Sequence, residues 1–139
     1  MITTPQTFTF NQFVQQISIA TGGDSFAGVM ATATGFGRTS DTSTATSAQV
    51  RFVTQPVITN AACLAAYGIV VSSHICMSTA GGRGTCTGDG GGPLFVTRDG
   101  VFLQIGVGSF MSAAGCEAGF PSGFTRLTEY TAWIAANRS

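Results

Sequence analysis

Hydrophobic and polar residues alternate in short runs along most of the chain, which is the period expected of strands with one buried face. The clearest run is 29–37 (VMATATGFG), which ends at glycines. Further strands are predicted at 14–19, 50–58, 69–71, 74–77, 93–97, 101–108 and 123–127. The turn Arg98-Asp99-Gly100 predicts a tight hairpin. The small polar residues of 38–49 (RTSDTSTATSAQ) predict an exposed loop.

Helical spacing occurs near the middle and at the end of the chain. The segment 60–67 (NAACLAAY) predicts a short helix with Asn60 as its N-cap. Leu127, Tyr130 and Ile134 recur on one helical face, so we expect a helix over 128–137. Many short strands, glycine-rich turns and one terminal helix indicate an all-β fold, a single antiparallel barrel with a C-terminal α-helix.

The charge content of the chain is low and balanced. Six arginines and six acidic residues give a net charge of 0, and 9% of the residues are charged. Neither nucleic acid nor an anionic membrane surface is therefore an expected partner. The sequence has no apolar run of about 18 residues, so it predicts no membrane span. With 44% hydrophobic residues and 11 Phe, the composition excludes a disordered chain.

All the basic residues are arginine, and the chain has no lysine. Lysine loses its charge near a pKa of about 10.4, whereas arginine keeps its charge beyond about 12. This composition therefore favours a protein that works in an alkaline fluid.

The four cysteines contain no CxxC pair, which argues against a zinc site and for two disulfides. Counting alone leaves three possible pairings of Cys63, Cys76, Cys86 and Cys116. Disulfides imply secretion, but the N-terminal residues lack a signal-peptide pattern. We therefore expect the natural start of the protein to lie upstream of residue 1.

A series of motifs resembles one protein family. The motifs are TGFGRTSD (34–41), PVITNAAC (56–63), ICMSTAGGRGTCTGDGGGPL (75–94), VGSF (107–110), GCEAGFPSGFTRLTEY (115–130) and the Trp133-Ile134 helix. In order and spacing they are similar to the C-terminal half of the chymotrypsin-like serine proteases of the trypsin family, above all insect midgut chymotrypsins and crustacean collagenolytic proteases. The resemblance implies a Greek-key barrel, the second of the family's two, over residues 27–139. Residues 1–26 would form the inter-barrel linker and the strand that enters the barrel.

The family's disulfide pairing, carried over to the matching positions, implies Cys63 with Cys76 and Cys86 with Cys116. Each of these bridges would restrict the denatured chain by about 3–4 kcal/mol in a loop-entropy model.

The catalytic residues of the family do not occur in this sequence. The family's nucleophilic serine follows Gly-Asp and precedes Gly-Gly-Pro-Leu, and Gly90 occupies that position here. The family's histidine and aspartate lie in the first barrel, which these 139 residues do not include. The single histidine, His74, is expected to be a packing or surface residue. Because the family's chemistry needs a nucleophile, a base and an orienting carboxylate, the resemblance predicts a truncated, catalytically inactive homologue without metal or cofactor.

The peptide-binding elements of the family are retained. The backbone N–H groups of Gly88 and Gly90 match the family's oxyanion hole. The resemblance assigns the specificity pocket to Gly84, Thr85, Ser109, Phe110, Met111 and Ser122. No carboxylate stands at Gly84, the base of this pocket, so an apolar or aromatic side chain is expected to be preferred over Arg or Lys. Met111 replaces the family's usual glycine and is expected to narrow the pocket mouth.

Asp89 matches an aspartate with a special role in the active family. There it pairs with an ammonium group that activation frees at the start of the first barrel. This sequence starts within the inter-barrel linker, so that partner is not expected. Because an unpaired carboxylate resists burial, we predict that Asp89 turns toward solvent or accepts hydrogen bonds from loop N–H groups.

Three functional interpretations remain open from the sequence. The first is an inactive homologue that is inert or binds peptides or another protease. The second is half of a serine endopeptidase whose first barrel is a separate chain, which Gly90 opposes. The third is a self-associating structural barrel, because half of a two-barrel protein exposes the face that its sister covers. The implied partners are a peptide, a first barrel or a second copy, and the ancestry implies secretion, with the alkaline gut lumen as one setting.

Overall fold

The structure is a computed structural model that describes residue 2 and residues 4–138. Its elements, in chain order, are β1 (Ser18–Ile19), β2 (Met30–Gly35), β3 (Arg51–Ile58), α1 (Asn60–Tyr67), β4 (His74–Met77), β5 (Pro93–Arg98), β6 (Val101–Phe110), β7 (Ser122–Arg126), the 3-10 helix η1 (Leu127–Tyr130) and α2 (Thr131–Asn137). In this part of the chain, no helix has the length and apolarity needed to cross a bilayer.

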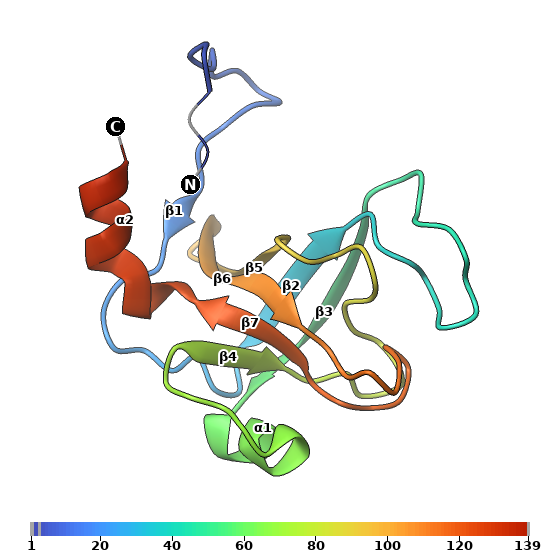
Figure 1. Cartoon of the computed structure of the whole chain (residues 1–139). Coiled ribbons are helices and arrows are strands. Elements are labelled where there is room, and N and C mark those ends of the chain that lie inside the picture. Colours follow the sequence, from blue (N-terminus) through green and yellow to red (C-terminus); the bar gives the residue numbers. More distant parts are fainter. Residues whose placement is uncertain (1, 3, 139) are drawn as a thin grey trace.

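Six of the strands close into an antiparallel barrel (Figure 1). They follow the order β6-β5-β2-β3-β4-β7, and β7 pairs back onto β6. Strand β5 returns beside β2 after the consecutive neighbours β2, β3 and β4, which is a Greek-key order. The short β1 runs parallel to β6, with Ser18 opposite Leu103. The predicted antiparallel barrel with a terminal helix is confirmed.

Apolar side chains from every strand of the barrel fill its interior. In β2 the inward positions are Ala31 and Ala33, as the alternating pattern predicts. Burial of each large core side chain contributes about 1.5–3 kcal/mol. The core consists of Ala20, Phe26, Ala31, Ala33, Val57, Ile75, Met77, Leu94, Val96, Ile105 and Phe124. Ala20 and Phe26 belong to the predicted linker and entering strand, so this segment contributes to the core. Residues 1 and 3 of the same segment lie outside the described residues.

The hairpin between β5 and β6 forms as its turn residues predict. Arg98 pairs with Val101, which leaves a two-residue loop of Asp99 and Gly100. Both loop residues have a positive φ, of 51° and 76°. This is the backbone of a type I′ turn, whose twist matches that of the two strands.

The start of α1 differs from the sequence prediction. Thr59, not Asn60, is the N-cap, and its Oγ1 accepts a hydrogen bond from the Ala62 amide at 3.1 Å. Asn60 already belongs to the helix, and its side chain donates to the Val71 carbonyl and accepts from Arg126. The prediction for Asn60 is wrong because an N-cap must have extended backbone, which Thr59 provides.

Three further elements differ from the predictions. The predicted strand at 69–71 is wrong, because this apolar run pairs with no strand among the described residues and Ile69 is 79% exposed. The strand predicted at 14–19 is limited to β1, since Asn11 folds the preceding residues into a local turn. The helix predicted at 128–137 begins as the 3-10 helix η1.

Candidate functional site

The glycine-rich loop before β5 consists of two consecutive turns. The Asp89 amide donates to the Cys86 carbonyl, and the Gly92 amide donates to the Asp89 carbonyl, both at 3.0 Å. Strand β6 fixes the loop, because the Gly91 amide donates to the Gly108 carbonyl at 2.9 Å and the Gly108 amide donates back to Gly92 at 2.8 Å. The loop is therefore held against β6 immediately before the predicted pocket residues Ser109, Phe110 and Met111.

Two backbone amides of this loop, those of Gly88 and Gly90, donate no hydrogen bond to the described residues. The two amides flank Asp89, and Gly88 has a φ of 101°, a conformation that favours glycine. Two free N–H groups in one tight turn are what a carbonyl or oxyanion oxygen requires.

Gly90 occupies an open position in the loop. A Cβ atom built at Gly90 meets no other atom within 4 Å, and φ is not positive there. A serine side chain would therefore fit without displacing any neighbour. Glycine at this position is therefore not required by packing.

Asp89 accepts hydrogen bonds from two loop amides. Its Oδ1 accepts from the Gly37 amide at 2.7 Å, and its Oδ2 accepts from the Cys86 amide at 2.9 Å. Gly35 and Gly37 leave room for the carboxylate, because a Cβ atom at either position would overlap it. Of the two arrangements predicted for Asp89, the structure has the one in which loop N–H groups bind the carboxylate.

A cavity of about 250 Å³ lies beside Asp89. Segments from three loops and from β2 and β3 line it, and its charged side chains are Arg38, Arg51, Arg83, Asp89 and Glu117. Of the predicted pocket residues, Gly84 and Thr85 line this cavity, whereas Ser109, Phe110, Met111 and Ser122 do not.

The predicted base of the specificity pocket is uncharged. Ser122 is buried, and its Oγ accepts a hydrogen bond from the Thr85 amide at 3.0 Å. A side chain at Gly84 would crowd Thr79 and Ser122. The structure thus places Gly84, Thr85 and Ser122 together, and none of these three side chains carries a charge.

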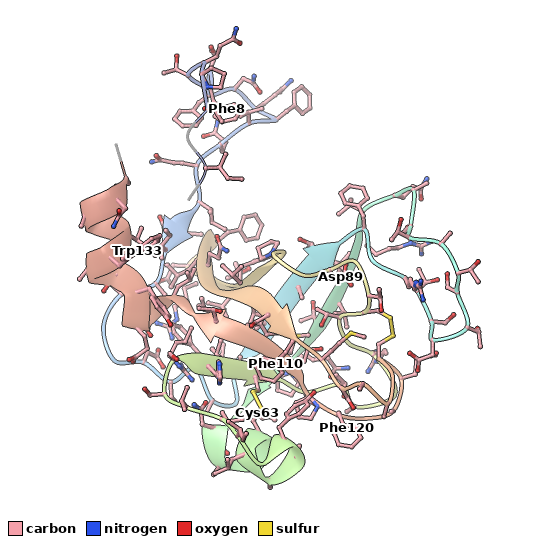
Figure 2. All side chains as sticks on the ribbon, in the orientation of Figure 1. Phe8, Cys63, Asp89, Phe110, Phe120 and Trp133 are labelled. Atoms are coloured by element: carbon pink, nitrogen blue, oxygen red, sulfur yellow. A yellow bond between two sulfur atoms is a disulfide. The ribbon has the colours of Figure 1, made fainter. Side chains whose placement is uncertain are left out.

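Phe110 lies in an aromatic cluster beside α1 (Figure 2). Its ring centroid is 5.2 Å from that of Tyr67 and 5.2 Å from that of His74, both in edge-to-face geometry. The ring of Phe120 packs on that of Tyr67, with 6.0 Å between the ring centroids. His74 is half-buried in this cluster and is therefore a packing residue.

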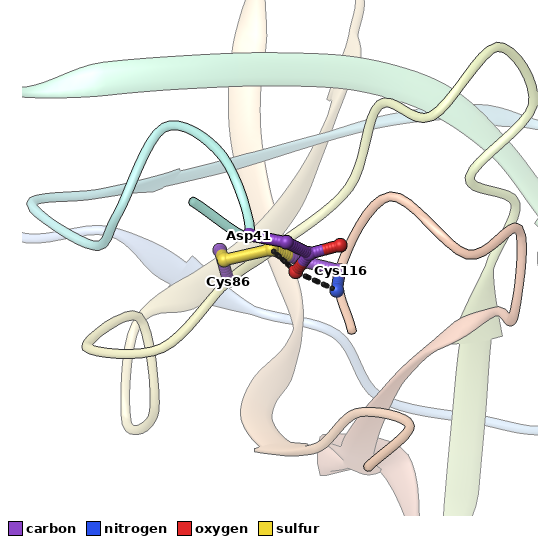
Figure 3. Close-up of side chains that lie close together, drawn as sticks. All are labelled: Asp41, Cys86 and Cys116. Atoms are coloured by element: carbon purple, nitrogen blue, oxygen red, sulfur yellow. Dashed lines mark hydrogen bonds between the residues drawn. A yellow bond between two sulfur atoms is a disulfide. The ribbon is translucent and has the colours of Figure 1, made fainter. Parts of the chain in front are cut away.

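Two disulfides are present, Cys63–Cys76 and Cys86–Cys116, the pairs that the resemblance implies. The Asp41 carboxylate lies against the second disulfide (Figure 3). Asp41, Cys86 and Cys116 have the spacing of a metal site. However, the two sulfur atoms are bonded to each other, so neither can act as a thiolate ligand.

Sequence reasoning missed two charged residues that join distant segments. Arg126 is almost fully buried, and its guanidinium donates to the carbonyls of Ser25, Ser72 and His74. Burial lowers the pKa of Arg126. Asp41, predicted only as part of an exposed loop, accepts a hydrogen bond from the Cys116 amide at 2.7 Å. Both residues lie within motifs that carry the resemblance, but their local sequence does not reveal these contacts, because their partners lie far away in sequence.

Comparisons with known proteins agree with this geometry. The family model described as Trypsin matches residues 1–134. The chain belongs to the trypsin family. Among curated members, it is 47% identical over 107 residues to brachyurin of Leptuca pugilator, covering 77% of this chain and 46% of that protein. It is 42% identical over 129 residues to a collagenase of Hypoderma lineatum, covering 89% of this chain and 47% of that protein.

A solved structure of HL collagenase has the same fold as this trypsin-family chain. It superposes with a TM-score of 0.80 at 36% sequence identity, covering 94% of this chain and 56% of that one. The chain spans about half the length of the curated relatives that it matches, 46% and 47% for the two named here. The resemblance inferred from the motifs is confirmed at the level of the family and the barrel.

Proposed function

We propose that this barrel binds peptide segments without cleaving them, as a catalytically inactive homologue of the secreted chymotrypsin-like serine endopeptidases. The observation that carries the proposal is Gly90, which stands in an open position where the family's motif has its serine. Whatever lies upstream of residue 1, Gly90 supplies no oxygen to attack a peptide carbonyl. Neighbouring backbone cannot compensate for a missing nucleophile.

Peptide binding is supported by the groups that remain around Gly90. The free amides of Gly88 and Gly90 offer two donors to a carbonyl oxygen. The uncharged base formed by Gly84 and Ser122 favours an apolar or aromatic side chain, because a buried guanidinium or ammonium would lack a partner there. The two disulfides support an extracellular setting.

Direct binding tests recognition. Two fluorescent peptides that differ only in a central Phe or Arg are titrated with the 139-residue chain, and anisotropy is measured. We expect the Phe peptide to bind more tightly by about tenfold or more. Gly84→Ala, which crowds the pocket base, should weaken binding of the Phe peptide. Gly23→Ala is the matched control, because a Cβ at Gly23 meets nothing within 4 Å. Equal affinity for both peptides, or no binding of either, contradicts the proposed recognition.

Turnover tests the loss of catalysis. The chain is assayed on a peptide substrate, alone and with the separately produced first barrel of a relative such as brachyurin. We expect no cleavage by the native chain in either case. Gly90→Ser with the first barrel should cleave about 10²-fold faster or more, because a positioned nucleophile and base then coexist. Cleavage by the native chain that a serine-directed reagent abolishes would instead favour half of a working endopeptidase.

A further inference from the structure

Asp41 attaches the loop that joins β2 to β3 to the loop that contains Cys116. The β2–β3 loop projects from the end of the barrel in Figure 1 and contains mainly Ser and Thr. Asp41 Oδ1 accepts from the Cys116 amide at 2.7 Å, and Oδ2 accepts from the Glu117 amide at 3.1 Å. In return, Glu117 Oε2 accepts from the Asp41 amide at 2.7 Å. All three are charge-assisted hydrogen bonds, which are stronger than neutral ones.

Gly115 provides the space that this contact needs. Its φ is 120°, and a side chain there would overlap the Asp41 carboxylate. Figure 3 shows the carboxylate directly beside Cys116. The segment 115–117 therefore combines a glycine that admits Asp41 with two amides that bind it. Asp89 is held in the same way. Gly35 and Gly37, which have no side chains, leave space for its carboxylate, and the Gly37 amide donates a hydrogen bond to it.

Together the two carboxylates connect three loops around one cavity. Asp89 joins the loop 81–92 to Gly37, at the start of the β2–β3 loop. Asp41 joins the β2–β3 loop to the loop that contains Cys116. The cavity beside Asp89 is lined from all three loops, by Arg38 and Thr39, by Arg83, Gly84 and Thr85, and by Cys116 and Glu117.

We propose that Asp41 is a positioning residue that holds together the three loops around the cavity beside Asp89, two of which carry predicted residues of the peptide-binding pocket. The Cys86–Cys116 disulfide joins two of the loops at a single point, whereas Asp41 orients the backbone of residues 116 and 117 and attaches the third loop. The β2–β3 loop places no hydrophobic side chain in the core, so hydrogen bonds are its main attachment. The consequence for recognition rests on the proposed function.

Amide hydrogen exchange and peptide binding test this role in the 139-residue chain. Asp41→Asn loses one of the two carboxylate acceptors. We expect the amides of Cys116 and Glu117 to exchange about tenfold faster, and the Phe peptide to bind about tenfold more weakly. The urea midpoint should change no more than in Asp24→Asn. Asp24 is the matched control because its carboxylate also binds an amide, that of Phe26, and pairs with Arg98 at a different part of the surface.

Glu117→Gln provides a second comparison. It keeps a side-chain carbonyl that can accept from the Asp41 amide, so exchange and affinity should stay near those of the native chain. Unchanged exchange in Asp41→Asn would overturn the proposal. Faster exchange with unchanged peptide affinity would overturn the positioning role in recognition. If the native chain binds neither peptide, the proposed function fails, and the exchange comparison still decides whether Asp41 holds the loops together.

Discussion

The lysine-free composition favours stability in alkaline solution, but one residue, Tyr67, acts in the opposite direction because its side chain is partly buried. Its hydroxyl donates to the Pro121 carbonyl, and its ring packs against Phe110. Burial raises the pKa of Tyr67 above its ordinary value of 10.0, because the phenolate is less well solvated in the folded protein. The unfolded chain, in which the ring is solvated, therefore loses this proton at a lower pH than the folded chain.

We predict that the free energy of unfolding falls as pH rises above 10.0, the pKa of an unperturbed tyrosine. Tyr67 contributes its full stabilisation below that pH and loses it as the pH rises through the raised pKa of the folded state. Urea unfolding from about pH 8 to about pH 11 measures the slope. Tyr67→Phe should reduce the pH dependence of the free energy of unfolding. At neutral pH it should lower that free energy by about 1 kcal/mol, because the hydrogen bond to Pro121 is lost. Identical slopes in the native and Tyr67→Phe chains would contradict the prediction.

At the scale of elements, predictions succeeded where the determining residues are close in sequence. The alternation in β2 and the Asp99-Gly100 turn are local, and both formed as expected. The motif around Gly90 is also local, so the sequence alone identifies Gly90 as the residue at the position where the family's motif has serine. Contacts such as that of Asp41 with Glu117, 76 residues away, depend on how the loops meet and leave no local pattern. The strand prediction at 69–71 was wrong because hydrophobic residues form a strand only where a neighbouring strand is available to pair with them.

The N-cap of α1 provides a test at the same scale. Thr59→Ala should lower the free energy of unfolding by about 1 kcal/mol, because the Ala62 amide loses the oxygen that caps it. Thr59→Ser keeps that oxygen and should retain most of the stability. Chemical denaturation of the three chains measures the difference. If both variants lose the same stability, the effect comes from the threonine methyl group and not from the cap.

At the scale of the whole molecule, the surface combines few charges with many exposed apolar side chains. Phe36, Val50 and Phe52, at the open end of the β2–β3 pair, are 56%, 61% and 77% exposed. Phe8, in the N-terminal segment that projects from the barrel in Figure 2, is 68% exposed. A surface of this kind favours association, since burial of apolar area is favourable and little charge opposes it.

We therefore predict that the chain associates with itself at micromolar concentration, partly through the Phe36, Val50 and Phe52 patch. Phe52→Thr keeps a residue that favours strands and removes the most exposed ring of this patch. It should raise the dissociation constant by about tenfold, because an exposed aromatic side chain is worth about 1.5 kcal/mol or more when buried. Sedimentation velocity over a range of concentrations measures the shift. Ile69→Thr is the matched control, because Ile69 is equally exposed but lies after α1, outside the patch. Equal shifts in both variants would mean that association is nonspecific, whereas a shift confined to Phe52→Thr locates the contact on the β2–β3 end of the barrel.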